Sequence, residues 1–289
     1  MSNSKGGFTV PVRILVDSTA DIPAQRAREL GIEVAPLTVE FGDESYRDGV
    51  DLDGPSFYRK LASSPKVPTT STPPPALFEE RYKKLIAEGA TGILAMHIAS
   101  GLSATYSVSR TAADEVTAAT GVPIEVIDSR QVSAGFGLPA EIVAEEARNG
   151  ASLAEVKAHA ESLLSRIHLV AALDTLTYLQ RGGRIGKSSA LLGTLLNIKP
   201  LLEVKGGEVL PLDKPRTRNK AQARIGEIIT ALGPLEAVAI AQSDDSIGQQ
   251  LQQVVRGFWS GPIETFSLGP VVGTHAGPGA AAVVAIARG

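Results

Sequence analysis

Short apolar runs alternate with amphipathic segments along the first half of the chain. Val12–Val16, Gly92–Ile98 and Ile124–Ile127 are too short for buried helices and are predicted to be strands. Leu77–Glu88 carries apolar or aromatic residues at helical spacing, and such segments separate the strands. Strands that alternate with helices form parallel sheets through crossover connections. The first half therefore predicts an α/β fold, whose other expected elements are a strand at Ile32–Val39 and helices capped by Asp21 and ending at Leu30, at Ser103–Ala119 and at Gln131–Arg148.

The second half of the chain is less regular. Leu201–Val204 and Glu208–Leu212 flank a Lys-Gly-Gly sequence, which predicts a hairpin. A hairpin beside helices is typical of a mixed α+β domain. We predict two domains, residues 1–160 and residues 161–289, bridged by a helix at Leu153–Arg166. The remaining elements expected here are strands at Ile167–Leu173, Ala237–Ala241 and Ile263–Phe266 and helices at Asn219–Leu232 and Ile247–Phe258.

Composition excludes several classes of protein. The 289 residues are 43% hydrophobic and 20% charged, which is typical of a globular protein with a core. A net charge of −3 gives no general attraction to nucleic acid. The N-terminal sequence lacks the apolar segment of a signal peptide, and the longest apolar run, Ala280–Ala287, is too short to span a bilayer. We expect a cytoplasmic protein with no stable membrane insertion.

Several catalytic signatures are missing. The chain has no cysteine, so disulfides, thiolate metal sites and cysteine nucleophiles are excluded. It has no phosphate-binding glycine motif of either common type, and no nucleophile elbow. The four histidines have no metal-ligand spacing, and His97, inside an apolar strand, is predicted to be a core residue with its polar atoms satisfied. We therefore predict no metal and no cofactor.

Hydroxyl side chains follow the predicted strands of the first half. Ligands of α/β sheets bind beyond the carboxyl ends of the strands. Ser103 lies where a glycine-containing loop enters a helix, so free backbone N–H groups should surround it, although a simple helix cap explains it as well. Two pairs of Asp and Ser residues are predicted to be ordinary cap and turn residues, and three hydroxyls in a proline-rich loop are either ligand donors or caps. These residues are Asp17, Ser18, Asp128 and Ser129, and Thr69, Thr70 and Ser71.

A glycine- and proline-rich segment, Gly269–Gly279, lies near the C-terminus and contains His275. Its composition argues against a helix or a central strand and favours a stiff loop. The histidine either meets a polar ligand or is satisfied by solvent and backbone. A cationic glycine-rich segment, Arg181–Lys187, is a second candidate for an anion site. A basic run at Lys214–Lys220 is either a solvated face or a surface for an acidic partner.

Taken together, the residues suggest hydroxyls, backbone donors and one histidine around a small anion. No nucleophile–base pair is visible, so the pattern favours binding over catalysis. It does not identify the ligand.

A series of short motifs follows one another along the chain in the order VDSTADIP, YRDGVDL, PTTS, SGLSATY, IDS, YLQRGGRIG, NIKPLL and GTHAGPG. With these motifs in this order, the chain closely resembles the DegV family of bacterial fatty-acid-binding proteins from about Val12 to its end. The resemblance implies two α/β domains with a long-chain fatty acid in a tunnel between them. It also implies a role in phospholipid metabolism, in which the protein presents the fatty acid to a separate ATP-binding fatty acid kinase subunit.

The resemblance implies roles for individual residues. Thr70 and Ser103 would hydrogen-bond the carboxylate, His275 would stand near it, and Arg181 or Arg184 would brace the network. Supporting residues would be Thr69, Gly273 and Gly277, and residues that dock the kinase subunit would be Arg216 and Arg218. The sequence departs from the family pattern at Thr72–Pro75 and at Ala104, which affects the expected carboxylate pocket.

Two other functions remain open at this stage. The chain is alternatively a stand-alone hydrolase or acyltransferase that uses Ser103 and His275. It is also compatible with a regulatory protein that senses fatty acids and binds another macromolecule. Because aromatic residues make up only 4% of the chain, we expect a ligand tunnel lined mainly by Leu, Ile, Val and Ala.

Overall fold

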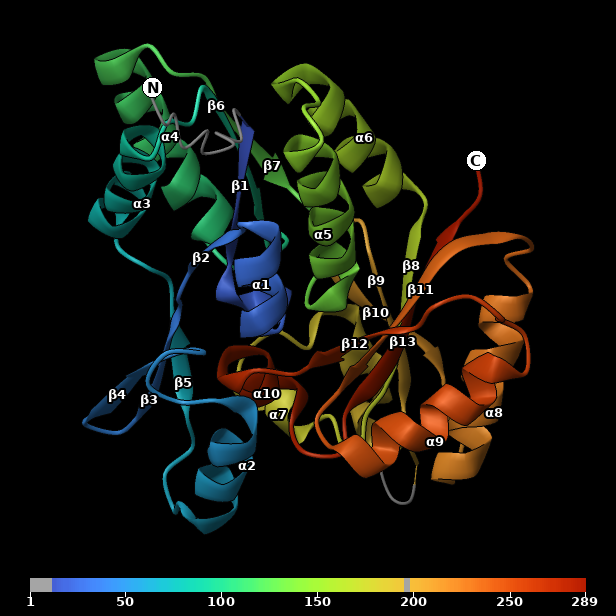
Figure 1. The fold of residues 1–289 in the computed structure, drawn as a ribbon. Helices are drawn as coiled ribbons and strands as arrows, with labels where there is room; N and C mark the ends of the chain where they lie inside the picture. The colour runs from blue at the N-terminus through green and yellow to red at the C-terminus, as the bar shows by residue number, and fades with distance from the viewer. Residues whose placement is uncertain (1–11, 195–197) are drawn as a thin grey trace.

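The strands form three sheets. The structure, a computed structural model, describes residues 12–194 and 198–289. Its sheets have the strand orders β2-β1-β6-β7, β4-β3-β5 and β10-β9-β8-β13-β11-β12. Figure 1 shows the four-stranded and six-stranded sheets in separate halves of the molecule, with helix α5 between them. The N-terminal segment and Asn197 of the NIKPLL motif lie outside the described residues.

The four-stranded sheet is entirely parallel, as predicted for the first half of the chain. Its two central strands are almost wholly buried, because helices cover both faces of the sheet. Helices α3 (Pro75–Ala87) and α4 (Thr105–Thr120) pack on one face, while α1 (Ala24–Leu30) and α5 (Ala134–Arg148) lie on the other. The strands are β1 (Val12–Asp17), β2 (Glu33–Ala35), β6 (Gly92–His97) and β7 (Ile124–Asp128).

The small antiparallel sheet was not expected from the sequence. The single strand predicted at Ile32–Val39 is wrong, because Pro36 separates β2 from β3 (Thr38–Phe41) and the two strands enter different sheets. The segment expected to be a proline-rich loop contains a strand, β5 (Thr69–Ser71), that pairs with β3. Strand β4 (Glu44–Arg47) pairs with the other edge of β3. Strand pairing between distant segments therefore outweighs the turn-forming composition of the loop.

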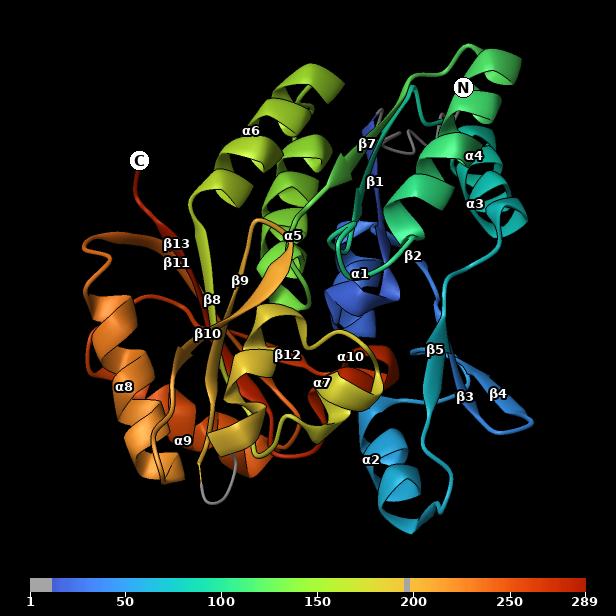
Figure 2. The same cartoon turned by 180° about the vertical axis from the view of Figure 1, so that it is seen from behind.

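The six-stranded sheet is mixed and contains the predicted hairpin. Strand β13, the apolar run near the C-terminus, lies at its centre between β8 and β11. It escaped assignment because a fully buried strand lacks the alternation that marks a half-buried one. Helices α8 (Arg218–Thr230) and α9 (Asp245–Arg256) cover its outer face, as Figure 2 also shows. The strands are β8 (Ile167–Ala172), β9 (Leu201–Lys205), β10 (Glu208–Asp213), β11 (Leu235–Gln242), β12 (Glu264–Ser267) and β13 (Ala281–Ala287).

Helix α5 joins the two halves. It contacts β1 and β6 of one sheet and β8 and β11 of the other, and the first ten residues of its sequence, Ala134–Val143, are buried except Ile142. Gly137 permits this approach, because a Cβ atom there would overlap the backbone oxygen of Ala20 and crowd the ring of Phe266. One hydrophobic cluster consequently runs from the first sheet through α5 to the second. The predicted domain boundary near residue 160 falls within α6 (Leu153–Ser165) and stays a prediction.

Two local predictions about helices are wrong. Asp21 does not cap α1; it ends a preceding 3-10 turn in the left-handed conformation, with φ of 54°. The segment expected to be a stiff loop near the C-terminus contains helix α10 (Pro270–Ala276). Proline fits the first position of a helix, where no N–H is needed, and Gly277 with φ of 75° ends it. Gly269 and Pro270 therefore mark the start of the helix and Gly277 marks its end, and none of them prevents it from forming.

Two further helices had no prediction. They are α2 (Gly54–Ser63), which follows the small sheet, and α7 (Thr177–Arg181), which follows β8. The predicted helix starting at Ser103 begins two residues later, at Thr105.

The packing of α5 predicts the effect of a small substitution. We expect Gly137→Ala to lower the free energy of unfolding by about 1–3 kcal/mol, because the added methyl group meets backbone that cannot yield. The loss should occur although alanine is the better helix former by about 1 kcal/mol. Urea denaturation measures the change. Gln249→Ala, on the exposed side of α9, is the control and should be nearly neutral. Unchanged stability in Gly137→Ala would contradict the close contact at Ala20.

Candidate functional site

A cavity lies where the three sheets and α10 meet. Its empty space, counted to its open mouth, is about 1020 Å³. Every apolar side chain that lines it is Leu, Ile, Val or Ala, as expected from the low aromatic content. The first half of the chain contributes Ile98, the six-stranded sheet contributes Val204 and Val209, and α10 contributes Val272. The structure therefore has a mainly aliphatic cavity between its two halves.

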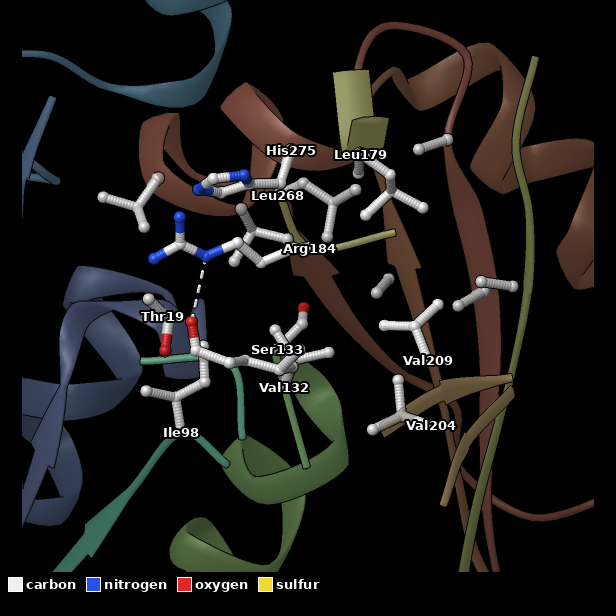
Figure 3. A pocket seen from close by; sticks show the side chains of 18 of the residues that line it. Thr19, Ile98, Val132, Ser133, Leu179, Arg184, Val204, Val209, Leu268 and His275 are labelled. Carbon is white, nitrogen blue, oxygen red and sulfur yellow. Dashed lines mark hydrogen bonds between the residues drawn. The ribbon is translucent and has the colours of Figure 1, made fainter. Parts of the chain in front are cut away.

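Polar side chains gather in one part of the cavity wall. Thr70, Thr72, Ser103, Arg184 and His275 all line the cavity, although they come from distant parts of the sequence. Figure 3 shows Arg184 and His275 on one side of the cavity, with Val204 and Val209 on the other. The cavity thus has a polar region and an aliphatic region.

Strand β5 places its threonine side chains by alternation. Successive side chains of a strand point to opposite faces. Thr70 meets His275, with 2.9 Å between Oγ1 and Nε2, and Thr72 meets Ser103, with 3.3 Å between the hydroxyl oxygens. The hydroxyls of Thr69 and Ser71 instead donate to the carboxylate of Glu40. The hydroxyls of Thr70 and Thr72 thereby meet site residues, whereas those of Thr69 and Ser71 bind Glu40 on β3, although Ser71 also lines the cavity.

Burial keeps the imidazole of His275 neutral. Desolvation first, and then the positive charge of Arg184, lower the pKa of His275 to about 4. Its Nε2 bonds to Thr70, while its buried Nδ1 has no hydrogen-bond partner among the described residues. Gly182, at the end of α7, packs directly against Nδ1, and a Cβ atom there would overlap the ring. Thr70 and Gly182 therefore fix the ring from two sides.

Arg184 is held in the wall by backbone oxygens. Its Nε donates to the carbonyl of Leu102 at 3.0 Å, and one terminal nitrogen donates to the carbonyl of Gly182 at 2.7 Å. The dashed line in Figure 3 marks the first of these bonds. No carboxylate among the described residues forms an ion pair with it. A guanidinium has five N–H donors, so several remain for a ligand.

Ser103 belongs to a hydroxyl network rather than to a nucleophile–base pair. Its Oγ lies 2.8 Å from the hydroxyl of Thr105 and accepts the backbone N–H of Thr105 at 3.3 Å. Among the described residues, no hydrogen bond joins Ser103 to His275. The imidazole of His275, which could act as a base for Ser103, is bonded to Thr70 instead.

A Ser–His–Asp chain does exist, but it is sealed in the core. His97 Nδ1 lies 3.0 Å from Asp17 Oδ2, and His97 Nε2 lies 2.6 Å from the hydroxyl of Ser109. All three side chains are fully buried. Asp17 also accepts the backbone N–H groups of Thr19 and Ile98, so it fixes the ends of two strands. The prediction that His97 is a satisfied core residue is confirmed.

The remaining predicted residues lie outside the cavity wall. Arg181 is exposed on the last turn of α7. Gly273 is buried against Phe57 and Tyr58, and Gly277 against Tyr178. Arg218 binds Asp174, which also binds Lys199, whereas Arg216 is exposed and forms no ion pair with another described residue.

Sequence reasoning missed two contributors to the site. Thr72 was noted only as a departure from the family pattern, although the alternation of a strand would have placed it beside Thr70. The function of Gly182 as a surface for the His275 ring had no local signal, because the two residues meet only in the folded chain.

Within residues 12–194 and 198–289, no cluster of three or more His, Cys, Asp or Glu side chains has the arrangement of a metal site. No helix in these ranges is both long and apolar enough to cross a membrane.

The charge of Arg184 predicts how His275 titrates. We expect NMR to show a neutral His275 imidazole down to about pH 5, because its pKa is lowered to about 4. Arg184→Met should raise that pKa, since it removes a positive charge that disfavours the imidazolium. His168 on β8 is the internal reference and should be unaffected, because burial and the charge of Lys205, not Arg184, lower its pKa. The same His275 titration in both proteins would contradict the proximity of Arg184.

Comparison with known proteins gives the family. The family model described as "Uncharacterised protein, DegV family COG1307" matches residues 11–288. A DegV domain-containing protein of Streptomyces coelicolor is 36% identical, over 96% of this chain and 99% of its own. Protein DegV of Bacillus subtilis is 33% identical, over 93% of this chain and 96% of its own.

Solved structures agree with these relatives over the whole fold. A DegV family protein from Thermus thermophilus, described with fatty acid binding, has a TM-score of 0.89 at 31% identity and covers 96% of this chain and 100% of its own. DegV from Bacillus subtilis, described as a fatty acid binding protein, has a TM-score of 0.84 at 28% identity and covers 96% of this chain and 99% of its own. The predicted α/β architecture is confirmed, and the chain belongs to the DegV family.

Proposed function

We propose that this protein binds a long-chain fatty acid in the cavity between its two halves. The observation that carries the proposal is the division of that cavity into an aliphatic region and a polar region with an unpaired cation, Arg184. Fatty acid binding by similar DegV structures supports it. An acyl chain gains free energy on leaving water for an aliphatic cavity, at about 0.8 kcal/mol for each buried methylene group.

The carboxylate belongs at the polar wall. Arg184 supplies a positive charge, and Thr70 and Ser103 supply hydroxyl donors that can turn toward a ligand. The neutral imidazole of His275 can donate from Nε2 to the oxygen of Thr70, which leaves the hydroxyl proton of Thr70 for the ligand. Hydrogen bonds to an ionised group are worth about 1.5–3 kcal/mol each. Several fixed donors can therefore replace the water that the carboxylate loses.

Neighbouring residues provide a matched test of this assignment. Thr70→Val should weaken fatty acid affinity about ten- to a hundredfold, because it removes a hydroxyl from the polar wall without changing the size of the side chain. Thr69→Val is the control, because the hydroxyl of Thr69 faces Glu40 outside the cavity. Titration with fluorescently labelled palmitate measures both. Equal affinities in the two folded variants would rule out the carboxylate position.

The bound fatty acid would be presented to a separate ATP-binding kinase subunit rather than modified by this chain alone. Ser103 lacks the hydrogen bond to a base that an activated nucleophile requires, which argues against a stand-alone hydrolase or acyltransferase. The Ser–His–Asp chain around His97 gives no alternative, because a substrate has no access to it. In this proposal the protein is a binding subunit without a cofactor.

Docking of the kinase subunit would use exposed basic side chains near the start of α8. Lys214, Arg216 and Lys220 are exposed, whereas Arg218 is half-buried and paired with Asp174. Free surface cations attract an acidic partner surface and raise the rate of encounter. Among the predicted docking residues, Arg216 is therefore the better candidate for a direct contact.

A charge-removal experiment separates docking from ligand binding. We expect Arg216→Ala to keep fatty acid affinity and to slow acyl-phosphate formation with a cognate kinase subunit, most strongly at low salt. Arg224→Ala, on the following helix α8, is the control, because Arg224 is already paired with Asp213 and Glu227. The readouts are ligand occupancy by mass spectrometry and coupled turnover across a salt series. Wild-type turnover of Arg216→Ala at every salt concentration would exclude this surface.

A further inference from the structure

Helix α10 receives its amino-terminal cap from the other end of the chain. Its cap residue, Gly269, has no side chain, and Pro270 has no N–H. The N–H of Gly269 donates to Asp21 Oδ1 at 2.8 Å, and Asp48 accepts the N–H of Val271. Two carboxyl groups that precede the helix by more than 200 residues thus take the place of a local cap.

The two carboxyl groups are built into a buried polar cluster. Asp48 accepts a hydrogen bond from Ser18 at 2.9 Å, and Asp21 accepts one from Ser133 at 2.5 Å. Their Oδ1 atoms lie 2.9 and 3.0 Å from the position that a Cβ atom of Gly269 would occupy, so both converge on the start of the helix. Asp21 and Ser133 each adopt positive φ, a costly conformation outside glycine. The backbone is therefore held in place for these contacts.

No cation neutralises this cluster among residues 12–194 and 198–289. Burial raises the pKa of Asp48 to about 7 and that of Asp21 well above its usual range, and the charge of Asp17 contributes to both. The phenol of Tyr58 is the other titratable group nearby, and burial and the charge of Asp21 raise its pKa. Burying two carboxyl groups without a cation costs free energy of folding. Their hydrogen bonds to the start of α10 offset part of that cost.

Those contacts bear on the fatty acid site through the length of α10. The helix has seven residues, which span about 10 Å at 1.5 Å each. His275 lies in its last turn, where Nε2 meets Thr70. Because this short helix packs against α2 and α7, we expect a change at Gly269 to shift the imidazole as well.

We propose that Asp21 and Asp48 are positioning residues for the carboxylate site, which cap α10 and thereby hold His275 against Thr70. The proposal rests on the fatty acid function proposed above. It also gives a role to the DSTAD and YRDG motifs, whose acidic residues do not themselves line the cavity but bind residues that do, Ser133 and Val271.

A double-mutant cycle tests the proposal. Asp48→Leu should weaken the affinity for labelled palmitate about tenfold, whereas Asp48→Asn, which keeps an oxygen acceptor for Val271, should retain most of it. In a His275→Ala background the effect of Asp48→Leu should disappear, because no imidazole remains to be positioned. Glu33→Gln is the control, since Glu33 is a buried carboxylate whose partners, Arg81 and Lys84, are unconnected with α10.

The outcomes separate this proposal from the proposed function. Loss of affinity in Asp48→Leu that persists in the His275→Ala background would show a general structural effect and overturn the positioning role. Wild-type affinity in Asp48→Leu would overturn it as well. Wild-type affinity in His275→Ala alone would instead overturn the participation of His275 in the proposed carboxylate site.

A spectroscopic measurement covers the case in which Asp48→Leu does not fold. Ser18→Ala removes the hydroxyl that donates to Asp48, and with it the acceptor of the backbone N–H of Leu37. We expect this variant to shift the NMR signals of the His275 imidazole and to weaken palmitate binding a fewfold. A folded Ser18→Ala protein with unchanged His275 signals and unchanged affinity would contradict the proposal.

Discussion

The charge of an unpaired guanidinium governs the polar end of the cavity. Arg184 is the only side chain with a permanent positive charge among the described residues that line the cavity, and it donates to two carbonyl oxygens. Carbonyl groups orient a cation without neutralising it, so part of the desolvation cost remains until an anion arrives. The same charge helps to keep His275 neutral, which leaves the imidazole as a donor rather than a second cation. In the proposed complex, one negative charge of the ligand would therefore meet one positive charge of the protein.

The sequence predicted the sheet of the first half because its signals are local. A buried strand such as the one predicted at Gly92–Ile98 is a short continuous apolar run. An amphipathic helix such as the one predicted at Leu77–Glu88 is longer, and its apolar residues recur at helical spacing, so the two patterns can be told apart locally. The hairpin that turns after Lys205 could be predicted equally well, because two glycines mark its turn. The family resemblance then indicated Thr70, Ser103 and His275, which the fold does bring to one cavity.

What remained hidden depends on contacts between distant segments. Strand β5 exists because it pairs with β3, and the proline-rich composition around it argued for a loop. Helix α10 was mistaken for a loop because its glycines and proline lie at its ends, and its cap comes from Asp21 and Asp48. Neither partner can be read from the residues around the helix. The sequence also could not tell which of Arg181 and Arg184 lines the cavity. That choice depends on how the chain after α7 turns back, so that Arg184 reaches the carbonyl of Leu102.

The buried chain of Asp17, His97 and Ser109 bears on how enzymes are recognised from coordinates. Its distances satisfy the geometric pattern of a serine hydrolase, while the hydroxyl of Tyr82, 2.6 Å from that of Ser109, and the helices around it leave no route for a substrate. A search that scores only interatomic distances would select this chain over the polar wall of the cavity. Solvent accessibility is therefore part of the definition of a catalytic triad. Here it distinguishes a buried hydrogen-bond chain that stabilises the ends of two strands from a chain that could catalyse a reaction.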